Sequence, residues 1–546
     1  MNNGTTKEAT TNEAIIKDVI VNDDDINNTA VKHIVIVGGG SAGWLVAGTI
    51  AAEHGNGDEG VQITLIESPD IKLVGVGEGT WPTMRATLKK MGISETEFVR
   101  ECDVAFKQAS KFCKWTTGEE GDEYYHPFTL PVGYRELNLA EYWKAYSNEI
   151  SFSDAVCVQS QVCANHMGPK LITTPEFSGI TNYAYHLDAA KFAVYLRKHC
   201  IEKLGVKHIT DNVIGINSAA NGDIRSLATQ HSGELRGDLF VDCTGLTSLL
   251  LGKHYQVPLI SKKEFLFNDA ALAAQVPYLD PECPISSNTI STAQSAGWVW
   301  DIGLQTRRGV GYVYSRTHIS DEDADKEFRA YLTLTIGKEK AEATEFQKIK
   351  FTPGHREVFW KNNCVAVGLA AGFIEPLEAS AIILIELSAK MISEQLPADR
   401  NAMTIVAKRF NDVFTYRWNH IINFLKLHYV LSKRSGSRYW IDHRNPDSIP
   451  QSLQELQALW KYQIPWFYDE VHLEELFPMA SFQYILYGMG YETAQRSTIK
   501  KANPAALERA AELLRDNIRK TNEVMKALPT HREIVNKIKH YGLQKI

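Results

Sequence analysis

Six consecutive small residues near the start of the chain have the pattern that binds a dinucleotide phosphate. The run Gly38-Gly39-Gly40-Ser41-Ala42-Gly43 fits G-x-G-x-x-G. Residues of this size allow a tight turn in which backbone N–H groups approach a pyrophosphate at the start of a helix. Glu67 ends the next apolar run, where a carboxylate can hold a ribose hydroxyl. The combination predicts a nucleotide-binding turn rather than a fortuitous group of glycines.

NAD and FAD both bind this kind of turn, so the rest of the chain must distinguish them. Two later segments, Val241–Gly245 (VDCTG) and Cys364–Phe373 (CVAVGLAAGF), again place glycine after an apolar strand. An extended flavin needs further backbone approaches from distant parts of a chain. Each segment alone is equally consistent with a buried strand and a turn, but their order favours FAD.

The elements that must position these residues follow an α/β pattern. His33–Val37 and Val61–Glu67 are predicted strands, and the helical composition from Trp44 onward completes a Rossmann-type βαβ unit. Apolar residues recur at helical spacing over Ser94–Trp115 and Leu187–Leu204. Alternation over about 253–354 predicts inserted antiparallel sheet, and the chain beyond residue 381 is predicted to be mostly helical.

These patterns divide the chain into three predicted regions. Residues 1–30 are polar and predict a disordered tail, because they cannot bury enough apolar surface to offset ordering. Residues 31–400 are predicted to form a discontinuous FAD-binding and catalytic module that includes the substrate-facing sheet. Residues 401–546 are predicted to form a helical region that caps the substrate.

Composition excludes several classes of protein. The 546 residues carry 58 basic and 65 acidic side chains, a formal charge of −7, which argues against nucleic acid as a partner. The eight cysteines form no C-x-x-C pair, which is typical of reduced thiols and predicts a cytoplasmic protein. Neither a signal peptide nor a membrane-spanning run is apparent, and no membrane partner is expected.

Several motifs together resemble the flavin-dependent tryptophan halogenases, in order from about residue 32 to about residue 500. Besides the opening strand and glycine turn, they are LVGVGEGTWP (Leu73–Pro82), AFKQASKFCKW (Ala105–Trp115), YYHPF (Tyr124–Phe128), GWVWDIG (Gly297–Gly303) and FIEPLEASAI (Phe373–Ile382). The resemblance implies a flavin monooxygenase-like FAD module with a largely helical substrate part.

The resemblance also implies a reaction and its partners. A separate NADH-dependent flavin reductase supplies FADH2, and O2 converts it to a flavin hydroperoxide. Chloride or bromide attacks this species to give hypohalous acid, which passes to a lysine and then to an electron-rich aromatic ring. A homodimer is left open, and no metal is expected, since His420 and His428 lack a third ligand nearby.

The catalytic roles fall on Lys107 and Glu378. A lysine ammonium can hydrogen-bond hypohalous acid, and the free amine can be halogenated. Read without the resemblance, Lys107 is an exposed helix residue paired with Asp103. Glu378 can stabilise the cationic ring and accept its proton, whereas its ordinary role would be a carboxylate at a helix start.

The remaining site residues are implied by the same resemblance. Trp298 and Trp300 share one side of a strand and line the channel, with no direct catalytic step assigned to them. The cofactor contacts are the glycine turn together with Glu67, Ser68, Gly79, Val213, Leu369 and Ile382. The halide contacts are Ser380 and Ala381, and the substrate pocket holds His126, Phe128, Phe477 and Ser481.

The chain departs from the family pattern at several positions. Gly303, Ala379, Ser380 and Ala381 stand where the motifs carry Pro, Ser, Thr and Gly. In the region that clamps free tryptophan, Phe477 and Ser481 replace the aromatic and amide residues, and His472 takes the place of the acid. We therefore expect a smaller indole or another electron-rich aromatic as substrate. An aromatic hydroxylase and a non-catalytic FAD protein are the alternatives.

Overall fold

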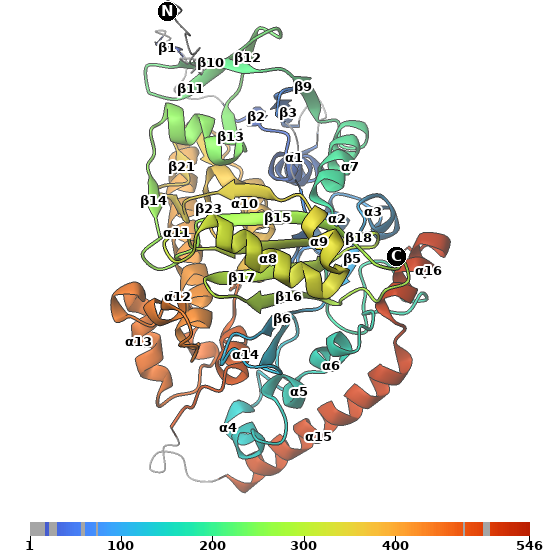
Figure 1. Ribbon diagram of the computed structural model, residues 1–546. Coiled ribbons are helices and arrows are strands. Elements are labelled where there is room, and N and C mark those ends of the chain that lie inside the picture. Colours follow the sequence, from blue (N-terminus) through green and yellow to red (C-terminus); the bar gives the residue numbers. More distant parts are fainter. Residues whose placement is uncertain are drawn as a thin grey trace, which may run out of the picture.

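The computed structural model describes residues 17–20, 30–55, 60–71, 75–472, 475–494 and 503–545. A six-stranded sheet with the order β21-β22-β13-β2-β3-β9 forms the upper part in Figure 1. All of its pairs are parallel except β21–β22. Its strands are β2 (His33–Val37), β3 (Gln62–Glu67), β9 (Lys207–Thr210), β13 (Leu239–Asp242), β21 (Trp360–Lys361) and β22 (Cys364–Ala366).

Three helices complete the predicted α/β unit: the first packs on β2 and β3, and the other two pack on the first. They are α1 (Ser41–His54), α7 (Ala189–Glu202) and α10 (Ser380–Glu394). The β-branched centre of β2, Ile34–Ile36, is fully buried, as a parallel strand covered on both faces requires. The predicted βαβ unit and the helix within Leu187–Leu204 are confirmed.

A seven-stranded sheet, β19-β15-β18-β17-β16-β6-β7, lies below the first one. Helices α8 (Asp321–Ile336) and α9 (Lys338–Ala343) cover one of its faces, and Phe328 and Leu332 of α8 pack on Val299 and Tyr312 (Figure 1). The strands are β6 (Ala109–Cys113), β7 (Glu123–Pro127), β15 (Ala270–Pro277), β16 (Asn288–Ala293), β17 (Gly297–Gly303), β18 (Arg307–Tyr314) and β19 (Gln347–Lys350).

This sheet confirms antiparallel pairing within 253–354 but adds two features that were not predicted. Helices α8 and α9 lie inside that range. Strands β6 and β7 come from much earlier in the chain, and β6 pairs with β16 in parallel.

The predicted helix Ser94–Trp115 is wrong over its second half. Only α3 (Glu95–Glu101) is helical, and the chain then takes a left-handed residue at Asp103 (φ 53°) and enters β5 (Ala105–Lys107). β5 belongs to the small sheet β4-β8-β5, with β4 (Glu78–Gly79) and β8 (Ala184–Leu187). Ala105 and Ala109 are four residues apart, a spacing that places them on one side of a strand as well as on one face of a helix.

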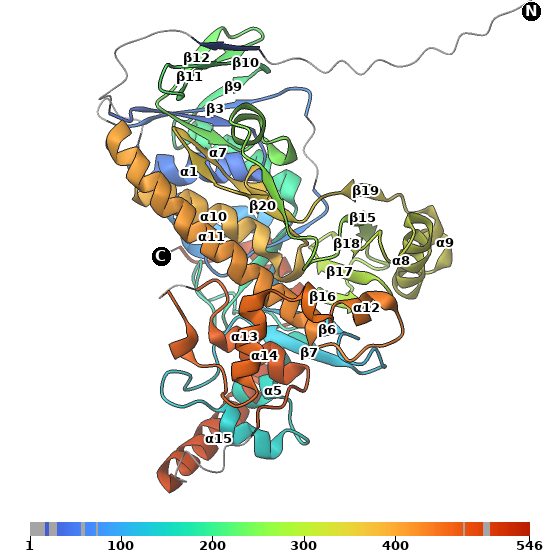
Figure 2. The same ribbon diagram turned by 90° about the vertical axis from the view of Figure 1, so that its left-hand side faces the viewer.

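After β23 (Gly372–Phe373), the described chain beyond residue 381 is mostly helical, as predicted. Figure 2 shows α11 (Arg400–Val430) running from the nucleotide-binding sheet down to the lower helices. These are α12 (Arg438–Asp442), α13 (Gln451–Trp460), α14 (Met479–Gly488), α15 (Pro504–Ala527) and α16 (His531–Tyr541). Asn503 caps α15, whose first residue is Pro504, a position where the missing N–H of proline is not needed.

Smaller elements complete the arrangement. Two further sheets have the orders β1-β10-β11-β12 and β14-β20-β23, and the short helices α2 and α4–α6 lie around the small sheet and β7. Their bounds are β1 (Lys17–Ile20), β10 (Val213–Ser218), β11 (Ile224–Thr229), β12 (Glu234–Arg236), β14 (Leu259–Ser261), β20 (Gly354–Arg356), α2 (Met84–Lys90), α4 (Ala140–Trp143), α5 (Phe152–Val156) and α6 (Gln159–Ala164).

The predicted tail, residues 1–30, lies mostly outside the described residues. Within it, the strand Lys17–Ile20 pairs in parallel with β10, which a disordered tail would not do. Among the described helices, none combines the length and apolarity that a bilayer span requires.

Candidate active site

The glycine turn connects β2 to α1 and is built for a close backbone approach. A Cβ at Gly39 would lie 1.6 Å from Glu67 Oε2, and one at Gly43 would lie 1.9 Å from the Gly38 carbonyl oxygen. Space is open above Gly40, the N-cap of α1, and neither a side-chain cap nor an acidic residue occupies the first turn. These features fit a dinucleotide pyrophosphate at the N-terminus of α1.

The other predicted cofactor residues gather at two places around this turn. Glu67 ends β3, and its backbone carbonyl accepts a hydrogen bond from the N–H of Asp211. Val213 lies two residues after Asp211. Ser68 follows Glu67 directly. Leu369 is 41% exposed and follows Gly368, where an added Cβ would lie 3.0 Å from Ala42 Cβ. Ile382 is buried in α10, and Gly79 lies further away, beside Lys107.

The Glu67 carboxylate is held in its ionised form. His208 Nε2 lies 2.8 Å from Glu67 Oε1, and Arg197 lies 3.4 Å from the same oxygen. Burial alone would raise the pKa of Glu67, but these partners lower it below its ordinary value. An ionised carboxylate over Gly39 is suited to accept hydrogen bonds from ribose hydroxyls.

Lys107 ends β5 and is completely buried. Its Nζ makes no hydrogen bond to protein and lies 5.1 Å from the centroid of the Phe128 ring. The exposed helix position and the pairing with Asp103 are therefore wrong, since Asp103 instead accepts a hydrogen bond from Thr306. Burial lowers the pKa of Lys107 to about 8, although the Glu378 carboxylate acts in the opposite direction.

Replacing Lys107 with methionine is expected to stabilise the fold by about 3 kcal/mol at pH 7. The folded pKa of about 8 lies below the ordinary 10.5, so the wild-type penalty is complete below pH 8. This penalty on the free energy of unfolding diminishes between pH 8 and 10.5 and is absent above pH 10.5. Urea unfolding across this range measures it. The control Lys111→Met removes a partly exposed lysine that pairs with Glu123 and should lower stability slightly. An equal gain in stability there would contradict the burial argument.

Glu378 and Ala379 form a strained turn ahead of α10. Both are left-handed without being glycine, with φ values of 64° and 56°. The indole Nε1–H of Trp81 donates to the Glu378 carbonyl at 3.0 Å and helps to hold the turn. The strain directs the Glu378 side chain into the protein instead of leaving it at the helix start.

Both oxygens of the Glu378 carboxylate have partners. His126 Nδ1 lies 2.7 Å from Oε1, and the Ser110 hydroxyl donates to Oε2 at 2.8 Å. His428 Nε2 lies 3.6 Å from Oε1. Burial alone would raise the pKa of Glu378, but the two histidines hold it well below its usual range, so the group remains a carboxylate.

Gly79 shows how closely Lys107 and this turn approach each other. A Cβ at Gly79 would lie 3.2 Å from Ala379 Cβ and 3.4 Å from Lys107 Nζ. The missing side chain therefore leaves room between the lysine ammonium and the turn that carries Glu378.

Aromatic rings pack together next to these charges. Trp81 lies 5.5 Å from Phe128 and 5.1 Å from Phe477 between ring centroids. Phe424 stacks on Phe477 at 3.9 Å. His126 Nε2 lies 2.9 Å from the Ser481 hydroxyl, so a hydrogen-bonded chain runs from Ser481 through His126 to Glu378. The four predicted pocket residues thus lie together, with Trp81 and Phe424 added.

Trp298 and Trp300 lie on β17 with ring centroids 6.3 Å apart, on one side of the strand as expected. The Trp298 indole donates to Glu375 Oε2 at 2.7 Å, and the Tyr429 hydroxyl donates to the same oxygen. This contact ties the tryptophan strand to the segment that leads to Glu378.

Ser380 and Ala381 occupy the first turn of α10. The N-cap is Ala379, which provides no side-chain cap, and no acidic residue lies in that first turn. The backbone N–H groups there are suited to an anion such as halide.

Sequence reasoning missed three neighbours of the candidate catalytic residues and misplaced one. Ser110 and His428 contact Glu378, and Trp81 holds its turn, although Trp81 lies within a motif that was already noted. His472, expected at the substrate, is exposed and packs on Tyr416. In the part of the chain that the structure describes, no group of three or more His, Cys, Asp or Glu is placed to hold a metal ion.

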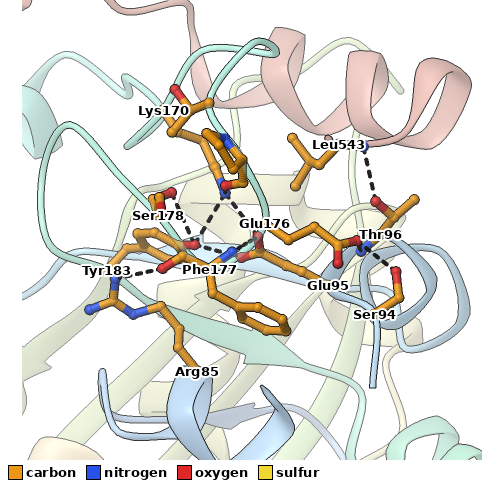
Figure 3. Close-up of polar contacts among 12 residues, drawn as sticks. Arg85, Ser94, Glu95, Thr96, Lys170, Glu176, Phe177, Ser178, Tyr183 and Leu543 are labelled. Carbon is orange, nitrogen blue, oxygen red and sulfur yellow. Dashed lines mark hydrogen bonds and ion pairs between the residues drawn. The ribbon is translucent and has the colours of Figure 1, made fainter. Parts of the chain in front are cut away.

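A buried ionic cluster supports the strand beside Lys107. Glu95 Oε1 accepts hydrogen bonds from the hydroxyls of Tyr183 and Tyr185, and Glu95 Oε2 accepts one from Lys170 at 2.8 Å (Figure 3). The two tyrosines flank Ala184, the residue of β8 that pairs with Lys107. All four side chains of the cluster are fully buried.

Comparison with known proteins shows the family to which this chain belongs. Residues 33–505 match the family described as tryptophan halogenase. The crystal structure of a tryptophan halogenase from Shewanella frigidimarina is 48% identical, with a TM-score of 0.92 over 95% of this chain and 99% of that one. Tryptophan 6-halogenase SttH from Streptomyces toxytricini is 33% identical over 89% of this chain and 95% of its own. A flavin-dependent halogenase from Brevundimonas, BrvH, is 29% identical, with a TM-score of 0.80 over 93% and 99% of the two chains. The chain belongs to the tryptophan halogenase family.

Proposed function

We propose that this enzyme halogenates a small electron-rich aromatic such as an indole, using Lys107 to deliver the oxidised halogen. The observation that carries the proposal is the position of Lys107: a buried ammonium without a protein partner that faces Phe128 and lies beside the Glu378 turn. An unpaired buried cation is costly, which indicates a group kept for function.

Family membership makes the chain an FADH2-, O2- and halide-dependent enzyme. Bound FADH2 supplies, with O2 and halide, the halogen in its electrophilic oxidation state. The glycine turn and Glu67 would hold the dinucleotide, and the first-turn amides of Ser380 and Ala381 would hold chloride or bromide. NADH-dependent reduction of FAD by a separate reductase is part of the proposal, as is a cytoplasmic location, which eight unpaired thiols support.

Lys107 acts as a hydrogen-bond donor in this scheme. With its pKa lowered to about 8, it remains mostly an ammonium at pH 7. Its N–H groups are free to donate to the oxygen of hypohalous acid, which makes the halogen more electrophilic. The surrounding aromatic side chains exclude water from the hypohalous acid until the aromatic ring of the substrate attacks it.

Glu378 stabilises the cation that forms when the ring takes up the halogen. Its charge is present throughout, and in a buried site a carboxylate interacts strongly with a developing positive charge. The cationic ring is itself a strong acid, so even a weak base can remove its proton. The chain through His126 to Ser481 holds the carboxylate in position.

The pocket favours an uncharged substrate over free tryptophan. Its described walls are the rings of Trp81, Phe128, Phe424 and Phe477, and the polar atoms of His126 and Ser481 are directed at each other. An amino acid would have to bury its ammonium and carboxylate among these rings, and the two charges nearby, Lys107 and Glu378, are the ones that this proposal assigns to the reaction itself.

We expect indole to be halogenated faster than tryptophan. The measurement is mass spectrometry of reactions that contain FAD, a reductase, NADH and either chloride or bromide, with equal concentrations of the two substrates. Omitting halide is the control. A faster reaction of tryptophan would overturn the substrate assignment, and an oxygenated product without halide would favour the hydroxylase alternative.

A further inference from the structure

His531 begins α16 and contacts the strand that carries Lys107. Its Nε2 accepts a hydrogen bond from the Phe106 backbone N–H at 2.7 Å, and both groups are buried. Nδ1 therefore carries the proton and lies 3.2 Å from the Ile285 carbonyl. Burial lowers the pKa of His531 to about 3, so the ring stays neutral and remains an acceptor at working pH. His531 lies beyond residues 33–505.

The hydrogen bond is placed next to Lys107 by strand geometry. Along a strand, backbone groups of alternate residues face opposite edges. Lys107 pairs with Ala184 of β8 on one edge. On the other edge, Phe106 N–H donates to His531, and Gln108 N–H donates to the Ser287 carbonyl at 2.7 Å. Both neighbours of Lys107 are thus fixed on the edge of β5 that faces away from β8.

α16 is itself firmly anchored, so His531 is a fixed acceptor. Ile534, Val535 and Ile538 are fully buried. After the helix, the Leu543 N–H donates to Thr96 Oγ1 at 2.9 Å, next to the Glu95 cluster (Figure 3). The same C-terminal segment therefore contacts both β5 and α3, the helix that carries Glu95.

We propose that His531 is a positioning residue for Lys107, holding the end of β5 so that the ammonium meets hypohalous acid in front of the aromatic pocket. The proposal rests on the proposed role of Lys107. It adds a contribution from the C-terminal helix, which lies beyond residues 33–505.

Two amide variants distinguish the hydrogen bond made by Nε2 of His531 from the one made by Nδ1. His531→Gln can place an oxygen where Nε2 accepts from Phe106. His531→Asn can still donate to the Ile285 carbonyl but is too short to reach Phe106. Val535→Ala is the matched control, since it loosens α16 without touching that hydrogen bond. A small scavenger of hypohalous acid reports how much oxidised halogen escapes, and amide hydrogen exchange reports the Phe106 N–H.

We expect His531→Asn to raise the ratio of scavenged halogen to halogenated product by about 10-fold, because small misplacements of a reacting group are costly. Exchange at Phe106 should accelerate, FAD affinity should be unchanged, and His531→Gln should remain near wild type. Wild-type leakage and exchange in His531→Asn, or equal leakage in Val535→Ala, would overturn the proposal. Full halogenation by Lys107→Met would show instead that the proposed function is wrong.

Discussion

Halogenation by a Lys107→Met variant is expected to be about 10²–10³-fold slower than by the wild type, while FADH2 is still oxidised by O2. Methionine fills a similar volume in the buried site but has no N–H to donate to hypohalous acid. The glycine turn and Glu67 lie away from Lys107, so formation of the oxidant should continue. Halogenated product by mass spectrometry and flavin oxidation by absorbance measure the two steps separately.

Lys111→Met is the matched control for this experiment. Lys111 lies four residues further on, pairs with Glu123 at the sheet edge and is outside the site. It should halogenate at the wild-type rate. Equal losses of halogenation and flavin oxidation in Lys107→Met would contradict a specific role in delivery and would indicate damage to the whole module.

The Glu378→Gln variant is expected to lose about 10²–10⁴-fold in halogenation rate. Glutamine keeps the shape of the side chain and can still accept the Ser110 hydrogen bond, but it has no charge to stabilise the cationic ring and is a much weaker base. The measurement is the rate of product formation at saturating halide and substrate, with flavin oxidation followed in parallel.

Glu386→Gln tests whether loss of any buried glutamate in α10 has this effect. Glu386 contacts Thr87 and Thr83, and burial raises its pKa to about 8, so it is already mostly uncharged at pH 7. Its replacement should be tolerated. Near-normal halogenation by Glu378→Gln would show that the carboxylate charge is not required.

The nucleotide-binding unit could be predicted because its signals are local. A β-branched strand, a glycine turn and a helix follow one another directly, and Glu67 comes one βαβ unit later. At Gly39 and Gly43 there is no room for a Cβ atom, which explains why no larger residue stands there. The antiparallel region could be predicted because apolar and polar residues alternate along its strands. The pairing with β6, which comes from a distant part of the sequence, could not.

The setting of Lys107 could not be predicted from its neighbours. The residues from Phe98 to Phe112 are spaced as on a helix, and only the tertiary pairing with β8 selects a strand after Asp103. The local sequence around Lys107 is therefore compatible both with an exposed lysine on a helix and with a buried lysine on a strand. The motif identified the residue, whereas its burial and its lowered pKa come from the fold.

Contacts between distant segments were also missed. Ser110 and His428 both contact the Glu378 carboxylate, yet nothing in the sequence spacing of these three residues indicates that they meet. His531 reaches the Lys107 strand from the end of the chain. These pairs form only when β6, α11 and α16 pack against segments that are distant in the sequence.

A single-turnover reaction tests most directly whether Lys107 delivers the halogen. Enzyme loaded with FADH2 is mixed with O2, bromide, indole and a scavenger of hypobromous acid, and both brominated products are quantified by mass spectrometry. We predict brominated indole from the wild type and from Lys111→Met. From Lys107→Met we predict a similar total of oxidised bromine that appears on the scavenger. Brominated indole from Lys107→Met at the wild-type yield would contradict the central claim.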